Sequence, residues 1–498
     1  MLLALRTLGI VAVCVLAACQ GTPAAPPATS DAARAASQHE PKPADHAVPA
    51  EATPAPAAAK PPAPSTTHPP AAVPFLHDDF DAALLRAKAE RKLLFVDAWA
   101  EWCHTCKSMQ AFVFTEPALT PLAERVLFLA LDTEKPENAA FLEQYAVSVW
   151  PSFFAIDPGS KRLIGYWPGS ASLAELRDFV QQSLDAQEAL TQATLDPKSP
   201  LALLIQAKTS QTRGDAARAA ALYEQALAKA PPGWSRRSEA LHGRLWSLAQ
   251  SRQIGPCNRF GERHLGEVTG SSLPAFFASI FLGCLEHEPN PQRRARLREQ
   301  VILRLGELLA SPEATMSADD REDTWRILSD AYAAAGKGAE AHQARLERLK
   351  VLEAAAEAAT TPQAKATFDA ARADTYLALG RGQDAVQMLQ ARMRELPDSY
   401  EPAARLATVH ERLGQNEAAL STLDIAIARA YGPRRLKYLA QRARLLEKLG
   451  RRAEQIETLR AEVAGYESQR GGQANAARTE DAQARLAKAL AAQGSSPP

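Results

Sequence analysis

A glycine-centred helical pattern returns at nearly constant spacing through the second half of this 498-residue chain. Each copy carries a glycine, then a small alanine, then a large apolar residue, as in GDAARAAALYEQAL, GRGQDAVQMLQARM and GQNEAALSTLDIAI. Gly380 and Gly414 are 34 residues apart, and Gly414 and Gly450 are 36 apart. A period of this length indicates a repeated pair of helices that buries its apolar face by stacking on its neighbours. We therefore predict an all-α array over residues 199–470.

The offsets within each copy resemble those of tetratricopeptide repeats, which implies a helical solenoid. Gly336 belongs to the same pattern, and the large residues Tyr332 and Tyr376 stand upstream of the glycines, where a first helix would pack. An alanine-rich bundle with accidental spacing is the alternative, and the matching offsets of four segments favour the repeats. Residues from about 235 to 315 fit the pattern poorly, so we expect irregular helical hairpins there.

The first twenty residues have the order of an export signal. Arg6 is followed by an apolar run over 8–18 that is too short to span a bilayer, and small residues directly precede Cys19. This order resembles the lipobox of bacterial lipoproteins, which implies that residues 1–18 are removed and that Cys19 is lipidated. Gln20 then implies the outer membrane, facing the periplasm. An ordinary secretory signal with an incidental cysteine is the alternative.

The stretch over residues 19–74 differs from everything that follows it. Fourteen of the 35 prolines lie between residues 20 and 74, among alanines, serines and threonines. Such a stretch has too little apolar bulk to bury a core, and it favours extended backbone. We predict a disordered tether that holds the domains away from the membrane.

The charges of the chain are balanced. Lys and Arg together number 57, as do Asp and Glu. Without a basic excess, the composition argues against nucleic acid or an anionic membrane surface as a partner. We expect contact with the membrane through the lipid anchor only.

Residues 75–185 alternate short apolar runs with helical patterns. The runs KLLFVDAWA and RVLFLALD are typical of buried strands, and SFFAID and RLIGYW are typical of two strands joined by a turn. Helical patterns lie over 81–91, from the cysteines onward, over 136–147 and over 172–184. The order β-α-β-α-β-β-α predicts an α/β domain.

Cys103 and Cys106 follow the first buried strand, where a helix is expected to begin. Free N–H groups at a helix start favour a thiolate, so Cys103 is the candidate nucleophile. Cys106, one turn further, would resolve the mixed disulfide and must lose a proton while buried. Asp97 lies six residues before Cys103 on the strand and is the candidate proton acceptor. The alternative for Asp97 is a strand-end carboxylate that faces water.

The run VDAWAEWCHTCK closely resembles the active-site strand, turn and helix of thioredoxin, in which the family has VDFWAEWCGPCK. Within that family the flanking sequence is closest in look to the periplasmic C-terminal domain of the thiol:disulfide interchange reductant conductors. The resemblance implies a thioredoxin-like fold and a thiol-disulfide oxidoreductase whose redox group is its own disulfide, with no cofactor. It also implies that Pro151 is a cis-proline of the substrate groove. Trp99, Trp102 and Lys107 are retained as supporting residues, the tryptophans serving as packing or as an apolar apron.

Four departures from the thioredoxin pattern matter, and the first is a dipeptide. His104 and Thr105 replace the glycine and proline between the cysteines, which leaves the direction open between a reductase and an oxidase or isomerase. A histidine here could stabilise the Cys103 thiolate. The bulky Trp150 could narrow the groove before Pro151. The remaining departures are Phe128, where thioredoxins carry a lysine near the buried carboxylate, and Ser152 in place of threonine.

A metal site is the rival interpretation of the cysteine pair. Zinc needs four ligands, which usually come from a second Cys/His pair. His104 lies between the two cysteines and cannot easily chelate with both. We therefore expect no metal.

The other cysteines left after export are Cys257 and Cys284, 27 residues apart in the irregular helical segment. An exported compartment permits disulfides, so a structural disulfide between two helices is our interpretation. Two free core cysteines and a relay for the first pair are the alternatives, and nothing in the sequence supports a relay.

These features predict a lipid-anchored envelope oxidoreductase that acts on a protein disulfide or dithiol. The array would bind an unknown protein or peptide and hold it near Cys103. The alternative is a repeat-based envelope scaffold or assembly protein whose thioredoxin-like domain is regulatory or inactive. Residues 471–498 are predicted to be a disordered or frayed helical tail.

Overall fold

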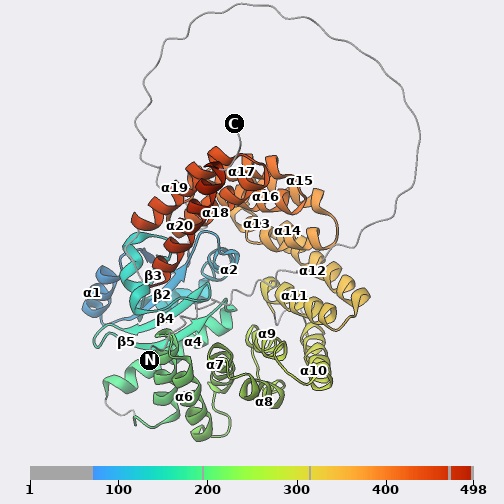
Figure 1. The fold of residues 1–498 in the computed structure, drawn as a ribbon. Coiled ribbons are helices and arrows are strands. Elements are labelled where there is room, and N and C mark those ends of the chain that lie inside the picture. The colour runs from blue at the N-terminus through green and yellow to red at the C-terminus, as the bar shows by residue number, and fades with distance from the viewer. Residues whose placement is uncertain (1–70, 193–195, 313–315, 469–472, 495–498) are drawn as a thin grey trace, which may run out of the picture. The chain divides into compact units, whose positions relative to one another are not determined.

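A computed structural model of the chain describes residues 71–192, 196–312, 316–468 and 473–494 (Figure 1). All of them belong to one folded unit, residues 64–498. The predicted signal peptide, the lipidation residue Cys19 and nearly all of the predicted tether lie outside the described residues. Among the described helices, none is both long enough and apolar enough to cross a membrane.

A five-stranded sheet forms the centre of the α/β domain, in the order β1-β3-β2-β4-β5. The first three strands in this order are parallel to one another, β4 runs antiparallel to β2, and β5 runs antiparallel to β4. Sequence reasoning missed β1, because three residues are too few to show a periodicity. The strands are β1 (Phe75–His77), β2 (Leu93–Trp99), β3 (Val126–Asp132), β4 (Ser152–Asp157) and β5 (Arg162–Pro168).

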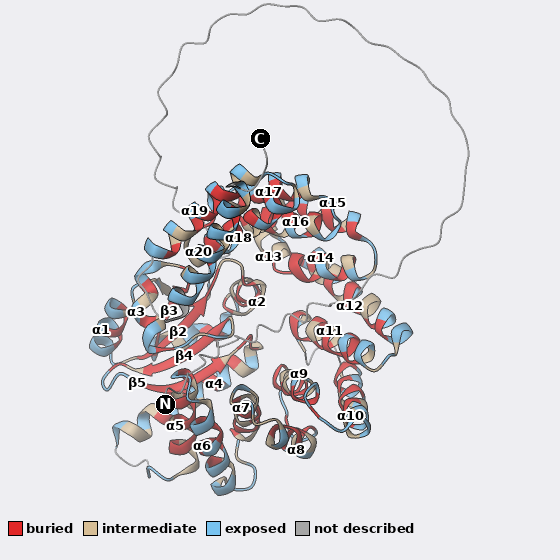
Figure 2. Ribbon diagram, viewed as in Figure 1, coloured by how far each residue is buried: buried red, intermediate tan, exposed pale blue. Residues whose placement is uncertain are grey.

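Every residue of β2 and β3 is buried, because both faces of the sheet are covered (Figure 2). Phe95 and alternate residues of β2 pack with Phe179 of helix α4 (Leu173–Thr191). Leu94 and Val96 point to the opposite face, where α1 (Phe80–Glu90) and α3 (Ala139–Gln144) cover them. The continuous apolar runs in the sequence are therefore buried strands, as predicted. They form the middle layer of a three-layer domain.

The helix that carries the cysteines changes character after its first five residues. It starts as α2 (His104–Ser108), widens into the π-helical turn η1 (Met109–Val113) and is followed by the 3₁₀ helix η2 (Pro117–Glu124). The helix predicted over 136–147 is likewise divided into a 3₁₀ turn, η3 (Pro136–Asn138), and α3.

Antiparallel helix pairs form the array after residue 199. In the predicted turns Gly214, Gly336, Gly380, Gly414 and Gly450 all have φ between 71° and 78°, a conformation that only glycine adopts without strain. This confirms the role that the repeat pattern assigned to them. The helices are α5 (Pro200–Thr212), α6 (Ala216–Lys229), α7 (Arg237–Gln250), α8 (Ile254–His264), α9 (Leu273–Leu285), α10 (Pro291–Leu309), α11 (Ala318–Ala334), α12 (Gly338–Ala358), α13 (Pro362–Ala366), α14 (Asp369–Ala378), α15 (Gly382–Glu395), α16 (Glu401–Arg412), α17 (Asn416–Arg429), α18 (Gly432–Lys448), α19 (Arg452–Ser468) and α20 (Gln473–Gly494).

The segment that fits the repeat poorly contains the second disulfide. Cys257 of α8 and Cys284 of α9 are joined, and both are buried. Gly261 of α8 lies so close to Phe281 of α9 that a side chain there would collide with its ring. The two helices therefore pack closely without the alanine pattern of the other pairs.

The tail predicted to be disordered or frayed is largely helix α20, which packs against α19. Arg485 forms two hydrogen bonds of 2.8 and 3.0 Å with Glu462, whose side chain is fully buried. Ala482 and Ala489 are buried in the same contact. The prediction was wrong because small alanine faces give little hydrophobic signal, although they allow close helix packing.

The array contacts the α/β domain at several places along its length. Lys208 of α5 donates a 2.7 Å hydrogen bond to the carbonyl of Tyr166 in β5 and pairs with Glu239 of α7. Glu175, which caps α4 together with Ser172, also accepts from the N–H groups of Ser271 (2.9 Å) and Ser272 (3.0 Å), next to α9.

Further along the array, α13 lies against α2 and η1. The rings of Phe112 in η1 and Phe368, next to α14, are 5.7 Å apart. The contacts of α13 and Phe368 place helices of the array beside the cysteine motif.

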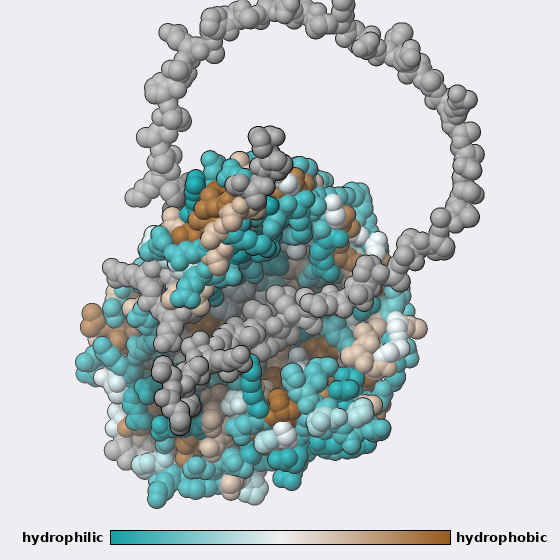
Figure 3. All heavy atoms as spheres, in the orientation of Figure 1, coloured by the Kyte–Doolittle hydropathy of each residue, from teal (hydrophilic) through white to brown (hydrophobic). Residues whose placement is uncertain are grey.

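The surface in view is mostly hydrophilic, with small apolar patches (Figure 3).

Candidate active site

Cys103 and Cys106 form a disulfide at the point where β2 gives way to α2. Cys103 is the N-cap of α2, and its sulfur accepts a 3.0 Å hydrogen bond from the N–H of Cys106. The side chain of Thr105 lies 3.4 Å from the same sulfur. Cys103 is only 3% exposed, and Cys106 is fully buried. The N–H groups of this first turn can stabilise a Cys103 thiolate.

Asp97 lies on β2 beneath the cysteine motif and is 1% exposed. Neither carboxyl oxygen has a hydrogen-bond partner among the described residues. Burial raises the pKa of this carboxyl from its ordinary 3.8 to about 8, so that it carries a proton at neutral pH. Its partner across the sheet, Ala130, packs with both cysteines. Phe128 packs on Phe95 at 5.3 Å and offers the carboxyl no charge or hydrogen bond.

The peptide bond between Trp150 and Pro151 is cis, as the sequence resemblance implied. The carbonyl of Trp150 accepts a 3.3 Å hydrogen bond from the hydroxyl of Thr105. Ser152 donates a 2.7 Å hydrogen bond to the carbonyl of Val149. Thr105 therefore connects the cysteine turn to the cis-proline loop.

The three tryptophans of the site have different surroundings. Trp99 is buried in the cluster that contains both cysteines, so it is a core residue rather than part of an exposed apron. The rings of Trp102 and Trp150 are 5.2 Å apart. Their N–H groups donate to Glu134 and Thr133 respectively, each at 2.8 Å. The loop after β3 therefore holds both indoles in place.

Sequence reasoning missed Thr133 and Glu134. The available signal was their position directly after a buried parallel strand, because the carboxyl ends of such strands meet at one edge of the sheet.

The surrounding protein neutralises the charge of Lys107 and keeps His104 uncharged. Lys107 forms a 2.9 Å ion pair with Glu101, which also accepts a 3.2 Å hydrogen bond from Ser399 of the array. His104 is partly exposed to solvent. Burial of its side chain by the surrounding protein, and then the positive charge of Arg405, lower its pKa to about 4. With the disulfide formed, His104 is therefore uncharged at neutral pH.

Residues of the C-terminal repeats cover the cysteine loop. Arg405 of α16 donates a 3.0 Å hydrogen bond to the carbonyl of Trp102, the residue before Cys103. The guanidinium of Arg434 in α18 lies 4.0 Å from the centre of the Trp102 ring. The N–H of Arg434 donates to Glu134 at 2.6 Å, and the hydroxyl of Tyr431 donates to Asp132 at 2.6 Å. No feature of the repeat pattern marks these residues.

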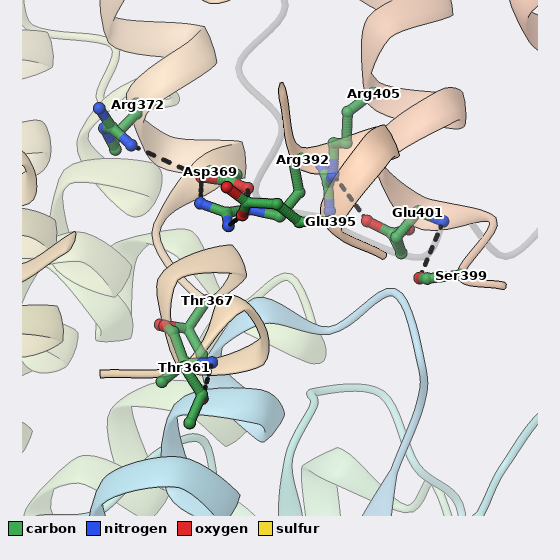
Figure 4. A network of polar contacts seen from close by, with 10 residues as sticks. Thr361, Thr367, Asp369, Arg372, Arg392, Glu395, Ser399, Glu401 and Arg405 are labelled. Carbon is green, nitrogen blue, oxygen red and sulfur yellow. Dashed lines mark hydrogen bonds and ion pairs between the residues drawn. The ribbon is translucent and has the colours of Figure 1, made fainter. Parts of the chain in front are cut away.

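A small hollow lies between the cysteine loop and α14–α16. His104 and Lys107 line one side, and Asp369 and Arg405 lie on the other. Figure 4 shows that the charged groups of the array side are paired with one another, Asp369 with Arg392 and Arg405 with Glu401, beside the pale blue ribbon of the α/β domain.

The described residues contain no group of three or more His, Cys, Asp or Glu side chains that could hold a metal ion. The redox group of the site is the Cys103–Cys106 disulfide itself.

The family described as Thioredoxin-like matches residues 76–158, which hold β1 to β4 and the cysteine motif. This part of the chain is a thioredoxin-like domain. The match ends before β5 and α4, which complete the fold in the structure.

Curated relatives match the same region. The thiol:disulfide interchange protein DsbD of Pseudoalteromonas atlantica is 26% identical over 110 residues, 21% of this chain and 19% of that protein. The thiol:disulfide interchange protein DsbD 2 of Pseudomonas aeruginosa is 35% identical over 83 residues, 16% of this chain and 14% of that protein. The chain therefore spans less than a fifth of the length of these relatives.

The helical region after the thioredoxin-like domain resembles tetratricopeptide repeat proteins. A tetratricopeptide repeat protein from Parabacteroides merdae aligns over 58% of this chain and 97% of its own, with 11% identity and a TM-score of 0.35. These values carry no argument about function. The repeat assignment rests on the helix pairs and their glycine turns.

Proposed function

We propose that this protein is an envelope thiol-disulfide oxidoreductase that exchanges protein disulfides through Cys103 and Cys106. The observation that carries the proposal is the Cys103–Cys106 disulfide at the start of α2, connected through Thr105 to a cis-proline loop. The similarity of this domain to thiol:disulfide interchange proteins supports the same reaction class.

In the reducing direction, the Cys103 thiolate attacks one sulfur of a substrate disulfide and releases the other as a thiolate. Cys106 then loses its proton, for which the ionised fraction of Asp97 is the buried acceptor, and attacks the Cys103 sulfur. The second substrate thiolate leaves, and two electrons have passed from the dithiol to the substrate. The oxidising direction is the reverse sequence, and the relative reduction potentials decide between them.

We propose that the array selects the substrate. Cys103 is 3% exposed, and Arg405, Tyr431 and Arg434 lie over the loop that carries it. While the repeats are in place, a folded protein surface cannot reach a sulfur enclosed to this extent. The substrate would therefore enter as an extended segment between the cis-proline loop and the array, or after the C-terminal repeats have moved away. A protein or peptide bound by the repeats would gain effective concentration at the cysteines.

We also propose that Cys19 carries a lipid that anchors the protein at the outer membrane, facing the periplasm. The order of Arg6, the apolar run and the small residues before Cys19 supports it. Cys19→Ala should abolish labelling by radioactive fatty acid and move the protein from the membrane fraction to the soluble fraction. Unchanged labelling of this variant would contradict the anchor.

The test of the enzyme is insulin reduction by the full chain with dithiothreitol, compared with Cys103→Ser. We expect the wild type to accelerate insulin precipitation and the variant to match the uncatalysed rate. Equal rates for the two proteins would reject the oxidoreductase and favour the alternative, a repeat-based scaffold with an inactive domain.

A further inference from the structure

Two arginines of the array contact Trp102, whose carbonyl carbon forms the peptide bond to Cys103. Arg405 donates from Nη2 to the Trp102 carbonyl at 3.0 Å, whereas Arg434 lies over the Trp102 ring. Arg405 is held in place by Glu401, one helical turn earlier on α16, at 2.9 Å. Of these two arginines, Arg405 is therefore the one that hydrogen-bonds to the main chain of the cysteine loop.

The hydrogen bond from Arg405 acts on the peptide group next to the reactive sulfur. The N–H of Cys103 donates to Ala100 at 3.0 Å, and its carbonyl accepts from Lys107 at 3.1 Å, so the peptide groups on both sides of Cys103 have fixed partners. A cation on the Trp102 carbonyl offsets the negative partial charge of that oxygen, and it adds a positive charge one peptide away from Cys103.

Arg434 adds a second positive charge over the Trp102 ring, whereas the remaining charged groups around the motif are paired or neutral. Lys107 is neutralised by Glu101, and Glu134 accepts from the Trp102 indole and from the N–H of Arg434. His104 is uncharged at neutral pH, and the carboxyl of Asp97 is protonated.

Two further groups of charge face His104 from the array. Asp323 and Arg326 of α11 form a 2.6 Å ion pair, and Arg348 of α12 pairs with Glu322 at 2.7 Å. Arg405 is the first charged group, after burial itself, among the causes that lower the pKa of His104. Its field therefore reaches the turn between the two cysteines in spite of its pairing with Glu401.

We propose that Arg405 is a positioning residue that stabilises the Cys103 thiolate and makes the Cys103–Cys106 disulfide more oxidising. This rests on the proposed oxidoreductase function. When the disulfide accepts two electrons, Cys103 leaves as a thiolate and Cys106 takes up a proton. Stabilising that thiolate favours the reduced form and raises the reduction potential. Arg405, more than 300 residues from Cys103 in sequence, thereby makes the reduction potential of the cysteine pair depend on the array.

The full chain tests this through the equilibrium with glutathione and the pH dependence of Cys103 alkylation. We expect Arg405→Gln to shift the glutathione equilibrium about three- to tenfold toward the disulfide, at most about 30 mV for this two-electron couple. The thiolate pKa should rise in the same variant. Arg405→Lys, which keeps the charge, should restore at least half of the shift. Arg412→Gln is the matched control, because Arg412 lies on the same helix in an exposed 3.0 Å ion pair with Asp374, and it should change neither measurement.

Glu401→Gln distinguishes an electrostatic effect of Arg405 on the cysteines from a role in which Arg405 only holds the array against the domain. If Arg405 acts through its charge, removing its carboxylate partner should shift the equilibrium in the opposite direction to Arg405→Gln. If Arg405 only fastens the array to the domain, the two variants should shift it in the same direction, and that result would overturn the proposal. Circular dichroism checks that each variant is folded, and Arg405→Lys supplies the comparison if Arg405→Gln is not.

An equilibrium for Arg405→Gln equal to that of the wild type would also reject the role of Arg405. In that case insulin reduction that still depends on Cys103 would leave the oxidoreductase intact. Insulin reduction equal in wild type and Cys103→Ser would instead reject the proposed function itself.

Discussion

The hydroxyl of Tyr431 donates a 2.6 Å hydrogen bond to the carboxylate of Asp132, which ends β3 of the thioredoxin-like domain 299 residues earlier. Burial raises the pKa of this carboxyl to about 6, although the Tyr431 hydroxyl acts in the opposite direction. The contact therefore joins the C-terminal repeats to the edge of the sheet where the cysteines lie.

We expect Tyr431→Phe to expose Cys103. Loss of this hydrogen bond to a carboxylate costs about 1.5–3 kcal/mol, so that the repeats separate from the loop more often. In the reduced protein, iodoacetamide should alkylate Cys103 roughly ten- to hundredfold faster if all of this free energy favours the open state. Tyr400→Phe is the matched control. The ring of Tyr400 contacts that of Tyr431 edge to face, and its buried hydroxyl has no hydrogen-bond partner among the described residues. Equal acceleration in both variants would mean that the loss of any buried hydroxyl in this cluster, and not the loss of the Asp132 contact, opens the site.

Asp97→Asn should change how stability depends on pH. The pKa of Asp97 is raised in the folded state, so its contribution to stability is fully present below about pH 4 and is lost as the pH rises through about 8. Asparagine cannot ionise. Thermal unfolding of the oxidised proteins should therefore give similar melting temperatures at pH 4 and a higher one for the variant at pH 8.5, by a few degrees or more. Parallel profiles across this range would show that the carboxyl ionises normally in the fold.

The same substitution should slow the resolving step, because Asn cannot accept the Cys106 proton. A slower release of a mixed disulfide, measured by quenching at short times, is the expected result. Attack by Cys103 on a small disulfide should change much less, since that step needs no proton from Cys106.

His104→Gln should leave the reduction potential at pH 7 nearly unchanged. With a pKa of about 4, the imidazole carries no charge there and has little electrostatic effect to lose. The expected change in the glutathione equilibrium constant is less than about twofold, or roughly 10 mV. A step near pH 6.5 in the potential of the wild type that disappears in His104→Gln would show that the histidine does become charged.

Replacing both Cys257 and Cys284 by serine should reduce stability and leave the chemistry intact. A disulfide that closes a loop of this size contributes about 2–4 kcal/mol, which urea unfolding under non-oxidising conditions would measure. Insulin reduction by the folded variant should equal that of the wild type. Loss of the reaction without loss of stability would revive the idea of a relay to the first pair.

The parts of the molecule with a strong local pattern could be predicted from the sequence. The runs around Phe95 and Phe128 gave two central strands, and Cys103, Cys106 and Pro151 were found through spacing and resemblance. Glycine turns at Gly380 and Gly414 gave the helix pairs.

What sequence reasoning missed depends on contacts between distant parts of the chain. Arg405, Tyr431 and Arg434 look like ordinary polar residues of solvated helices. Periodicity shows which face of a helix meets the next hairpin, but not what faces the inner side of the array. The charge of His104 could not be predicted for the same reason, since its low pKa comes first from burial and then from Arg405 of the array.

Gly432, at the start of α18, has a φ of 53° and no room for a side chain, because a Cβ would collide with the carbonyl of Glu134. The main chain of the array and the main chain of the redox domain are in direct contact at this point. The two modules are thus not interchangeable parts. A chimera that grafts another thioredoxin-like domain onto this array would have to preserve the course of the loop at Glu134, and an array grafted onto this domain would have to bring a glycine to the same place.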